Sequence, residues 1–220
     1  MRRLIAIVSC HSYAYPKQDE GGGHRSGENK DRASAIRRTW YGNWLRYKNV
    51  VDLKFFYGRG ADRCPDADEV FLDCGDDYYS LPEKVQKTFE WCLANGYDQV
   101  LKCDDDVFVF VDRLVSDFRN DDYRGFEVEA AIGKYASGTA YWISHRAMEI
   151  IVGTKWNPTD WAEDKFVGKA LSEKGIPVIH DPRFQCCHCP GCESRYPMAE
   201  RITTHTVDPN SMVELWQMTS

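Results

Sequence analysis

Three consecutive aspartates, Asp104, Asp105 and Asp106, are the side chains in this sequence best suited to chemistry. They lie in the segment LKCDDDVFVFV, between two apolar runs that predict buried strands. Adjacent carboxylates repel one another, and burial makes an unpaired carboxylate costly. A cation relieves both costs, and oxygen ligands favour Mn²⁺ or Mg²⁺, with a diphosphate as the natural co-ligand. A solvated acidic turn is the structural alternative, and the flanking apolar strands argue against it.

A second cluster of possible metal ligands lies near the C-terminus and comprises Cys186, Cys187, His188, Cys189 and Cys192. Its four cysteines fall within seven residues and offer a structural Zn²⁺ site. Structural zinc sites usually draw two ligands from a distant segment, however, and only His180 is near. Reduced thiols or a local disulfide are therefore favoured over zinc.

Length, charge and cysteine content narrow the class of protein. The chain has 220 residues, enough for one domain with a sizeable core. Its net charge of -6, from 34 acidic and 28 basic residues, argues against a nucleic-acid partner. No apolar run approaches the length of a transmembrane helix, so no membrane partner is expected. An odd number of cysteines, nine, favours reduced thiols, and we expect a soluble, cytoplasmic protein.

Periodicity predicts strands that alternate with helices. Strands are expected at residues 2–10, 50–58, 69–72, 97–102, 107–111 and 139–143. Helices are expected from 31 to before 50, from 81 to 95 behind a capping box of Ser80 and Glu83, from 144 to 152, and from 161 to 174. Residues 11–30 predict a long glycine-rich loop. The alternation favours a single α/β domain over residues 1–220, with a mostly parallel sheet flanked by helices. In such sheets ligands bind where strands end, as at the acidic triplet.

Several motifs in this chain resemble, in the same order, those of the beta-1,3-galactosyltransferase and N-acetylglucosaminyltransferase family that includes Fringe. They are RASAIRRTW (32–40), FFYGRG (55–60), the block at 77–109 that ends in KCDDDVFV, YASGTAYWIS (135–144), WAEDKFVGKAL (161–171) and HTVDPNSMVELW (205–216). The resemblance spans nearly the whole chain. It implies a GT-A type, Rossmann-like nucleotide-sugar transferase fold with a nucleotide-sugar-binding half, 1–112, and an acceptor half, 113–220, that carries the Cys-rich loop 186–192.

The function that the resemblance implies is an inverting, metal-dependent hexosyltransferase. It would move a hexose or N-acetylhexosamine from a UDP-sugar to an acceptor hydroxyl. The family's residues carry over to this chain with Asp106 as the direct metal ligand, and with Asp104 and His205 completing the metal shell. Asp104 and Asp105 would also orient the ribose or a metal-bound water. A histidine that stands alone in a threonine-rich segment has a surface or capping role as its alternative.

The resemblance also implies residues around the donor. Arg37 and Lys102 would present positive charge to the nucleotide, with structural ion pairing as the alternative. Ser137 and Gly138 would line the donor-sugar pocket, where a small residue lets the backbone approach a ligand.

The catalytic base implied by the resemblance is Asp164, the second acid of the E-D pair, with Glu163 in reserve. Both acids lie in the first turn of a predicted helix, where an acidic side chain is favourable for structural reasons alone. Trp142 and Trp161 are candidates for acceptor stacking or for the core. Ala136 and Ala140 depart from the family's usual residues, which leaves the acceptor-side wall open to difference.

Two other functions remain at this stage. A metal-dependent phosphohydrolase or nuclease would use the same acids and histidine with two metals. A non-catalytic sugar-nucleotide-binding module is the other, and the presence of both Asp106 and Asp164 argues against it. The acceptor is open among a glycan, a protein, a small molecule and a hydroxylated nucleobase.

Overall fold

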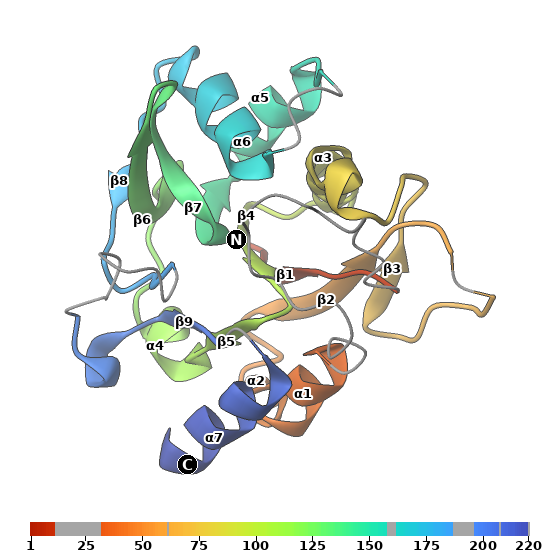
Figure 1. The fold of residues 1–220 in the computed structure, drawn as a ribbon, viewed down its shortest axis with the longest axis vertical. Coiled ribbons are helices and arrows are strands. Elements are labelled where there is room, and N and C mark those ends of the chain that lie inside the picture. Colours follow the sequence, from red (N-terminus) through yellow and green to blue (C-terminus); the bar gives the residue numbers. More distant parts are fainter. Residues whose placement is uncertain (12–31, 61, 158–161, 187–195, 207, 220) are drawn as a thin grey trace, which may run out of the picture.

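A seven-stranded sheet, in the order β3-β2-β1-β4-β7-β6-β8, crosses the protein (Figure 1). The computed structural model describes residues 1–11, 32–60, 62–157, 162–186, 196–206 and 208–219. The strands are β1 (Arg3–Val8), β2 (Asp52–Tyr57), β3 (Glu69–Phe71), β4 (Gln99–Asp104), β6 (Tyr123–Ala130), β7 (Gly133–Ser144) and β8 (Ile179–His180). The four strands β3, β2, β1 and β4 run parallel, and β7 is antiparallel to both β4 and β6. The predicted mostly parallel α/β sheet is confirmed.

Two apolar clusters pack on the two faces of the sheet. On β1, Ile5 and Ile7 belong to one cluster, while Leu4, Ala6 and Val8 belong to the other. Successive side chains of a strand point to opposite faces, so a strand covered on both sides is apolar throughout. This explains the unbroken apolar run at the start of the sequence.

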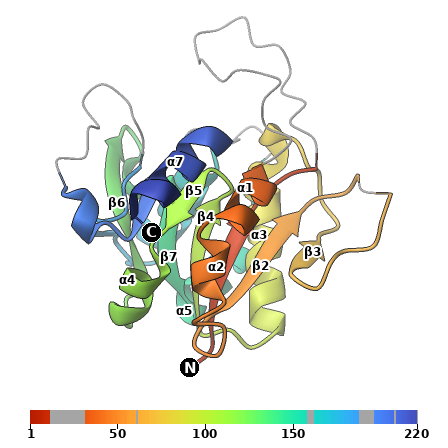
Figure 2. The ribbon, with the colours of Figure 1, turned by 90° about the horizontal axis from the view of Figure 1, so that it is seen from below.

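Helices cover both faces and position the ends of the strands. One side carries α1 (Arg32–Arg38), α2 (Tyr41–Trp44), α4 (Val111–Ser116) and α7 (Pro209–Thr219), and α7 packs against α1 (Figure 2). The other carries α3 (Leu81–Ala94), α5 (His145–Gly153) and α6 (Glu163–Ser172). Two 3₁₀ turns, η1 (Tyr78–Ser80) and η2 (Met198–Glu200), lie between these elements. None of the helices in the described ranges has the length and apolarity needed to cross a bilayer.

A second, two-stranded sheet stands beside the main one. It pairs β5 (Val107–Val109) with β9 (Thr203–His205) in antiparallel register, so that Val107 faces His205. β5 follows β4 directly after the acidic turn, whereas β9 comes from the far end of the sequence. The predicted halves 1–112 and 113–220 therefore share this small sheet as well as the main one.

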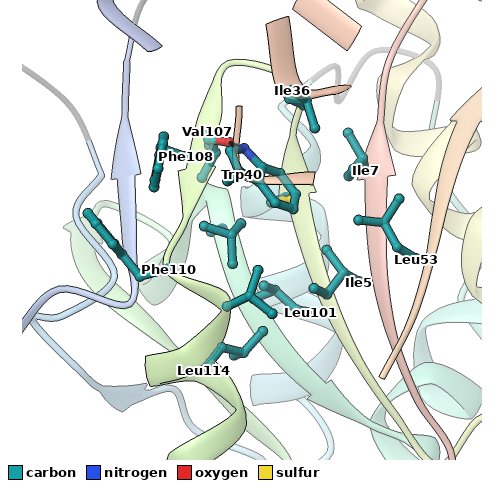
Figure 3. Packing of buried hydrophobic residues seen from close by; sticks show 14 of the residues in the cluster. Ile5, Ile7, Ile36, Trp40, Leu53, Leu101, Val107, Phe108, Phe110 and Leu114 are labelled. Atoms are coloured by element: carbon teal, nitrogen blue, oxygen red, sulfur yellow. Dashed lines mark hydrogen bonds between the residues drawn. The ribbon is translucent and has the colours of Figure 1, made fainter. Parts of the chain in front are cut away.

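Trp40 connects the first helices to the strand that follows the acidic turn. Its side chain is fully buried, and its indole N–H donates to the carbonyl of Val107 over 3.2 Å (Figure 3). The ring packs in the same cluster as Ile36 and Leu101. A buried indole N–H needs such a partner, so this contact fixes where β5 begins relative to α1.

Local details differ from the sequence-based expectations in two places. The expected single helix from 31 is divided into α1 and α2, because the Thr39 hydroxyl and amide bond back to Ala35 and Ile36 and tighten the end of α1. The expected capping box is wrong, since Ser80 makes no side-chain cap on α3. Asp77 caps η1 instead, accepting from the Ser80 amide at 3.0 Å. The strands β6, β8 and β9, the helices α4 and α7, and the turns η1 and η2 had not been predicted.

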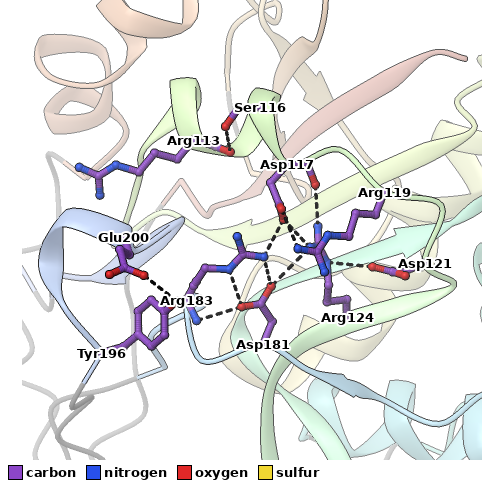
Figure 4. Close-up of polar contacts among 10 residues, drawn as sticks. All are labelled: Arg113, Ser116, Asp117, Arg119, Asp121, Arg124, Asp181, Arg183, Tyr196 and Glu200. Atoms are coloured by element: carbon purple, nitrogen blue, oxygen red, sulfur yellow. Dashed lines mark hydrogen bonds and ion pairs between the residues drawn. The ribbon is translucent and has the colours of Figure 1, made fainter.

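A buried ion-pair network joins α4, β6 and the segment that leads to β9 (Figure 4). The Asp117 carboxylate lies 2.6 Å from the guanidinium of Arg124 and 2.7 Å from that of Arg183. Asp181 pairs with Arg183 at 2.7 Å. The Arg183 carbonyl accepts from the amide of Ile202, the residue before β9. The network therefore anchors the strand that carries His205.

Asp117→Asn tests this anchor. Arg124 is 1% exposed, so the loss of its carboxylate partner leaves a buried cation undercompensated. We expect the free energy of unfolding to fall by about 3 kcal/mol. Denaturant unfolding at neutral pH measures this. Asp112→Asn, an exposed carboxylate on the same helix, is the control and should change stability by about 0.5 kcal/mol or less.

The contribution of Asp117 should also depend on pH. Burial alone would raise the pKa of this carboxyl, but hydrogen bonds from Arg183 and Arg124 lower it from 3.8 to about 2. A depressed folded-state pKa stabilises above the unfolded value and loses its effect as pH falls. The wild type should therefore lose roughly 2 kcal/mol relative to Asp117→Asn between about pH 4 and pH 2. If the free energies of unfolding of the two proteins fell by the same amount over this pH range, the network would be contradicted.

Candidate functional site

The acidic triplet occupies the turn where the chain leaves the main sheet for the small one. Asp104 ends β4, and Val107 begins β5 after only two intervening residues. The three carboxylates differ in their contacts. Asp104 contacts Lys102 of β4, Asp105 contacts Ser9 after β1, and both Asp105 and Asp106 contact Arg32 of α1. The turn is therefore the point at which the sheet edge, α1, α6 and the small sheet meet.

Asp106 contacts the histidine predicted to share its metal. Its Oδ2 lies 3.2 Å from Nε2 of His205 and 2.8 Å from the guanidinium of Arg32. Burial alone would raise the pKa of Asp106, but the hydrogen bond and charge of His205 and the charge of Arg32 lower it. Burial alone would lower the pKa of His205, and Asp106 raises it. Arg32 and His205 thus both favour the ionised form of the Asp106 carboxylate.

The Asp106–His205 pair fits a divalent cation. Ligands at 2.0–2.2 Å in octahedral geometry lie about 3 Å apart, close to the 3.2 Å between these two atoms. Two further buried atoms, Asp106 Oδ1 and His205 Nδ1, have no hydrogen-bond partner in the described part of the chain. Among the described residues, no three His, Cys, Asp or Glu side chains converge as a ready-made metal site. A cation here would need oxygens from a ligand and from water besides these two side chains.

Asp105 is turned toward β1. Its Oδ2 accepts from the hydroxyl of Ser9, the residue that follows β1, at 2.6 Å. Its Oδ1 lies 3.3 Å from the guanidinium of Arg32. The end of β1 is itself held by Lys84, whose buried ammonium donates to the Ser9 carbonyl at 2.9 Å and to Asp76 at 2.7 Å. The ends of β1 and β4 are therefore linked through side chains as well as through the sheet.

Asp104 is turned the other way, toward a buried lysine. The ammonium of Lys102 is fully buried and contacts Asp104 at 2.7 Å, Glu163 at 3.2 Å and the carbonyl of Gly138 at 2.5 Å. Glu163 also accepts from the hydroxyl of Tyr141. Lys102 thus ties the end of β4 to β7 and to the first turn of α6.

Charge in this cluster is tightly balanced. Burial alone would lower the pKa of Lys102, but the charges of Asp104 and Glu163 raise it. Burial, with the charges of Asp106 and Glu163, raises the pKa of Asp104 to about 7, although Lys102 opposes the shift. Burial likewise raises the pKa of Glu163. A cation close to Asp104 would favour its ionised form.

The two acids at the start of α6 have different environments. Glu163 is 3% exposed, and both of its oxygens are engaged, by Lys102 and by Tyr141. Asp164 is partly exposed; its Oδ1 accepts from the Lys165 amide at 2.8 Å, and its Oδ2 accepts a long bond, 3.3 Å, from the Gly138 amide. A general base must be able to reach a substrate proton, which favours Asp164 over Glu163.

Gly138 allows this close packing. A Cβ at this position would lie 2.9 Å from Oε2 of Glu163, closer than real Cβ contacts. Its neighbour Ser137 is partly exposed, with its hydroxyl 3.2 Å from that of Thr139. The role of both residues in a sugar pocket stays a prediction.

Other predicted site residues lie elsewhere. Arg37 pairs with Asp68 and Glu69, each at 3.0 Å, which is the structural alternative raised for it. Trp142 is fully buried and stacks on Phe118, so it belongs to the core rather than to an acceptor surface. Trp161 lies outside the described residues.

The predicted zinc loop also falls largely outside the described residues. Cys187, His188, Cys189 and Cys192 are not described, and Cys186 is buried. Cys64, Cys74, Cys92 and Cys103 have free thiols, in agreement with the expected reduced cysteines. The zinc alternative stays a prediction.

Four residues near the triplet had no assigned role in the sequence-based prediction: Ser9, Arg32, Asp76 and Lys84. Two signals were present. Arg32 opens the first of the motifs, and Lys84 lies between buried positions of α3, where an unpaired lysine is rarely tolerated. Their partners could not be identified, because Ser9 and Arg32 meet the triplet only in the folded protein.

Comparisons with known proteins support the fold. No family model and no curated protein sequence matches this chain. The crystal structure of HddC from Yersinia pseudotuberculosis is similar with a TM-score of 0.51 and 10% identity, covering 100% of each chain. A glycosyltransferase involved in the glycosylation of the major capsid of PBCV-1 is similar with a TM-score of 0.47 and 15% identity, covering 98% of this chain and 99% of that one. The Rossmann-like α/β fold is confirmed by the order and direction of the strands, and at these identities the likeness to solved structures concerns the fold alone.

Glu163→Gln tests the buried cluster. The amide removes one negative charge beside a fully buried ammonium, so we expect a loss of about 2–3 kcal/mol in the free energy of unfolding. Glu173→Gln, at the exposed end of the same helix, should change stability by about 0.5 kcal/mol or less. Denaturant unfolding compares the two variants. Equal stabilities would show that Lys102 does not depend on Glu163.

Proposed function

We propose that this protein is an inverting, metal-dependent glycosyltransferase that moves a hexose or N-acetylhexosamine from a UDP-sugar to an acceptor hydroxyl. One observation carries the proposal: two side chains able to hold a cation lie at one strand end, and a chain of contacts leads from this turn to a reachable carboxylate. Asp106 and His205 are the two side chains, and Asp164 accepts from the amide of Gly138, whose carbonyl accepts from Lys102. The finer resemblance to beta-1,3-galactosyl- and N-acetylglucosaminyltransferases is part of this proposal.

The donor's diphosphate would bind beside Asp106 and His205. A bound Mn²⁺ or Mg²⁺ ion supplies Lewis-acid stabilisation of the departing diphosphate. Asp105, which accepts from Ser9 at 2.6 Å, would also accept from the ribose, and Lys102 contacts Asp104 at 2.7 Å. Ser137 and Gly138 would border the sugar, since the backbone there is not shielded by a side chain at Gly138.

Asp164 would take the proton of the acceptor hydroxyl. In inverting transfer the hydroxyl attacks the sugar from the face opposite the diphosphate, so a single carboxylate within hydrogen-bond reach suffices. Asp104 contacts Lys102, Lys102 donates to the Gly138 carbonyl, and the Gly138 amide donates to Asp164. This chain of contacts links the candidate base to the acidic turn and supports the division of roles. A glycan, a protein, a small molecule and a hydroxylated nucleobase are all compatible acceptors.

UDP binding should require a divalent cation, because the acidic turn would otherwise repel the phosphates. Calorimetry with UDP in Mn²⁺ and in EDTA measures this. Asp106→Ala should abolish the Mn²⁺-supported binding while the protein remains folded, as its melting temperature will show. Equal UDP affinity in Mn²⁺ and EDTA would be evidence against the metal site.

Asp164→Asn should remove the base while keeping the size of the side chain. We expect UDP affinity to be retained and kcat to fall by on the order of 10²–10⁴, the range for a positioned general base. Steady-state transfer with a working donor and acceptor measures the change.

Glu163→Gln is the comparison for the base assignment, with rates normalised to the folded fraction because this variant is expected to be less stable. It should cost much less transfer per folded molecule than Asp164→Asn. If Asp164→Asn stays active and folded Glu163→Gln is inactive, the base is Glu163.

A further inference from the structure

Arg32 contacts the same carboxylate oxygen that faces His205. Its guanidinium lies 2.8 Å from Asp106 Oδ2 and 3.3 Å from Asp105 Oδ1, and His205 Nε2 lies 3.2 Å from that Asp106 oxygen. The Arg32 side chain is 10% exposed and that of Asp106 is 11% exposed. A permanent positive charge therefore lies, shielded from water, at the position where a divalent cation is proposed to bind.

A guanidinium and a divalent cation cannot share this place without repulsion. Two like charges a few Å apart in a partly buried site repel by several kcal/mol at intermediate dielectric constants. Arg does not lose its proton in proteins, so it relieves the repulsion only by moving or by meeting an anion. The diphosphate is such an anion, and the planar fork of Arg suits phosphate oxygens.

We infer that Arg32 is the resident counter-ion of Asp105 and Asp106, that it competes with the divalent cation for them, and that it pairs with the donor's diphosphate once the cation binds. This inference rests on the proposed function. It assigns to Arg32 the coupling between metal and nucleotide: the cation alone binds weakly, and the cation with the diphosphate binds strongly. The carboxylates are then never left uncompensated, with or without a donor.

Calorimetric titrations test the coupling through binding rather than through turnover. Mn²⁺ alone, UDP alone, and UDP in saturating Mn²⁺ are titrated into wild type, Arg32→Gln and Arg38→Gln. Arg38 lies on the same helix, is exposed, and controls for the loss of one positive charge. Melting temperatures establish that each variant is folded.

Arg32→Gln should tighten binding of Mn²⁺ alone by about 5-fold or more, because its competitor is gone. The factor by which Mn²⁺ strengthens UDP binding should fall by about as much, since linkage between the two ligands is reciprocal. Arg38→Gln should match the wild type in both. Increased metal affinity after removal of a site residue is not the result expected if Arg32 only supports the structure.

Arg32→Lys covers the case in which Arg32→Gln does not fold. Lysine keeps the positive charge but lacks the planar fork, so binding of Mn²⁺ alone should stay weak while the factor by which Mn²⁺ strengthens UDP binding falls. If that factor is unchanged in either folded variant, the inference is overturned. Unchanged or weaker binding of Mn²⁺ alone by Arg32→Gln overturns it too.

Wild-type behaviour separates the two proposals. A wild type whose UDP affinity does not respond to Mn²⁺ overturns both the proposed function and the role of Arg32. A wild type with strong Mn²⁺-dependent UDP binding, alongside an Arg32→Gln variant that behaves like it, overturns only the role of Arg32.

Discussion

The fully buried ammonium of Lys102 is the contact on which the arrangement of the site depends. Lys102 lies on the central strand β4, and its three partners come from the acidic turn, from β7 and from α6. A buried ammonium is tolerated only when its hydrogen bonds are satisfied and its charge is balanced. The position of α6, and with it that of Asp164, is therefore linked to the acidic turn.

The other buried polar and charged side chains at the strand ends are paired in the same way. Lys84 holds the end of β1 through the Ser9 carbonyl, and Ser9 in turn holds Asp105. Arg32 and His205 balance Asp106 from two other elements. Each carboxylate of the triplet thus has its own basic or hydroxyl partner, which explains how three adjacent acids persist at a largely buried turn. A ligand that brings both a cation and a diphosphate can replace this balance without leaving a charge uncompensated.

Regions remote from the turn contribute by fixing the elements that carry the site. Trp40 ties α1 to the start of β5 through the Val107 carbonyl, and the Asp117 network anchors the segment that leads to β9. β5 and β9 pair with each other, so both contacts determine where His205 meets Asp106. The distance between these two side chains is a property of the tertiary structure, because Asp106 directly precedes β5 and His205 is the last residue of β9.

The sequence by itself determined the α/β class, most of the strands, and the acidic turn at a strand end, because these follow from local periodicity and from the cost of burying like charges. Its motifs also singled out His205 and the acids at the start of α6. Only the tertiary structure decided that Glu163 pairs with Lys102 while Asp164 stays partly exposed. It also decided that Arg37 pairs with Asp68 and Glu69, and that Arg32 contacts the triplet. Adjacent residues of one type have the same local pattern, and their roles diverge only when residues distant in the sequence supply different partners.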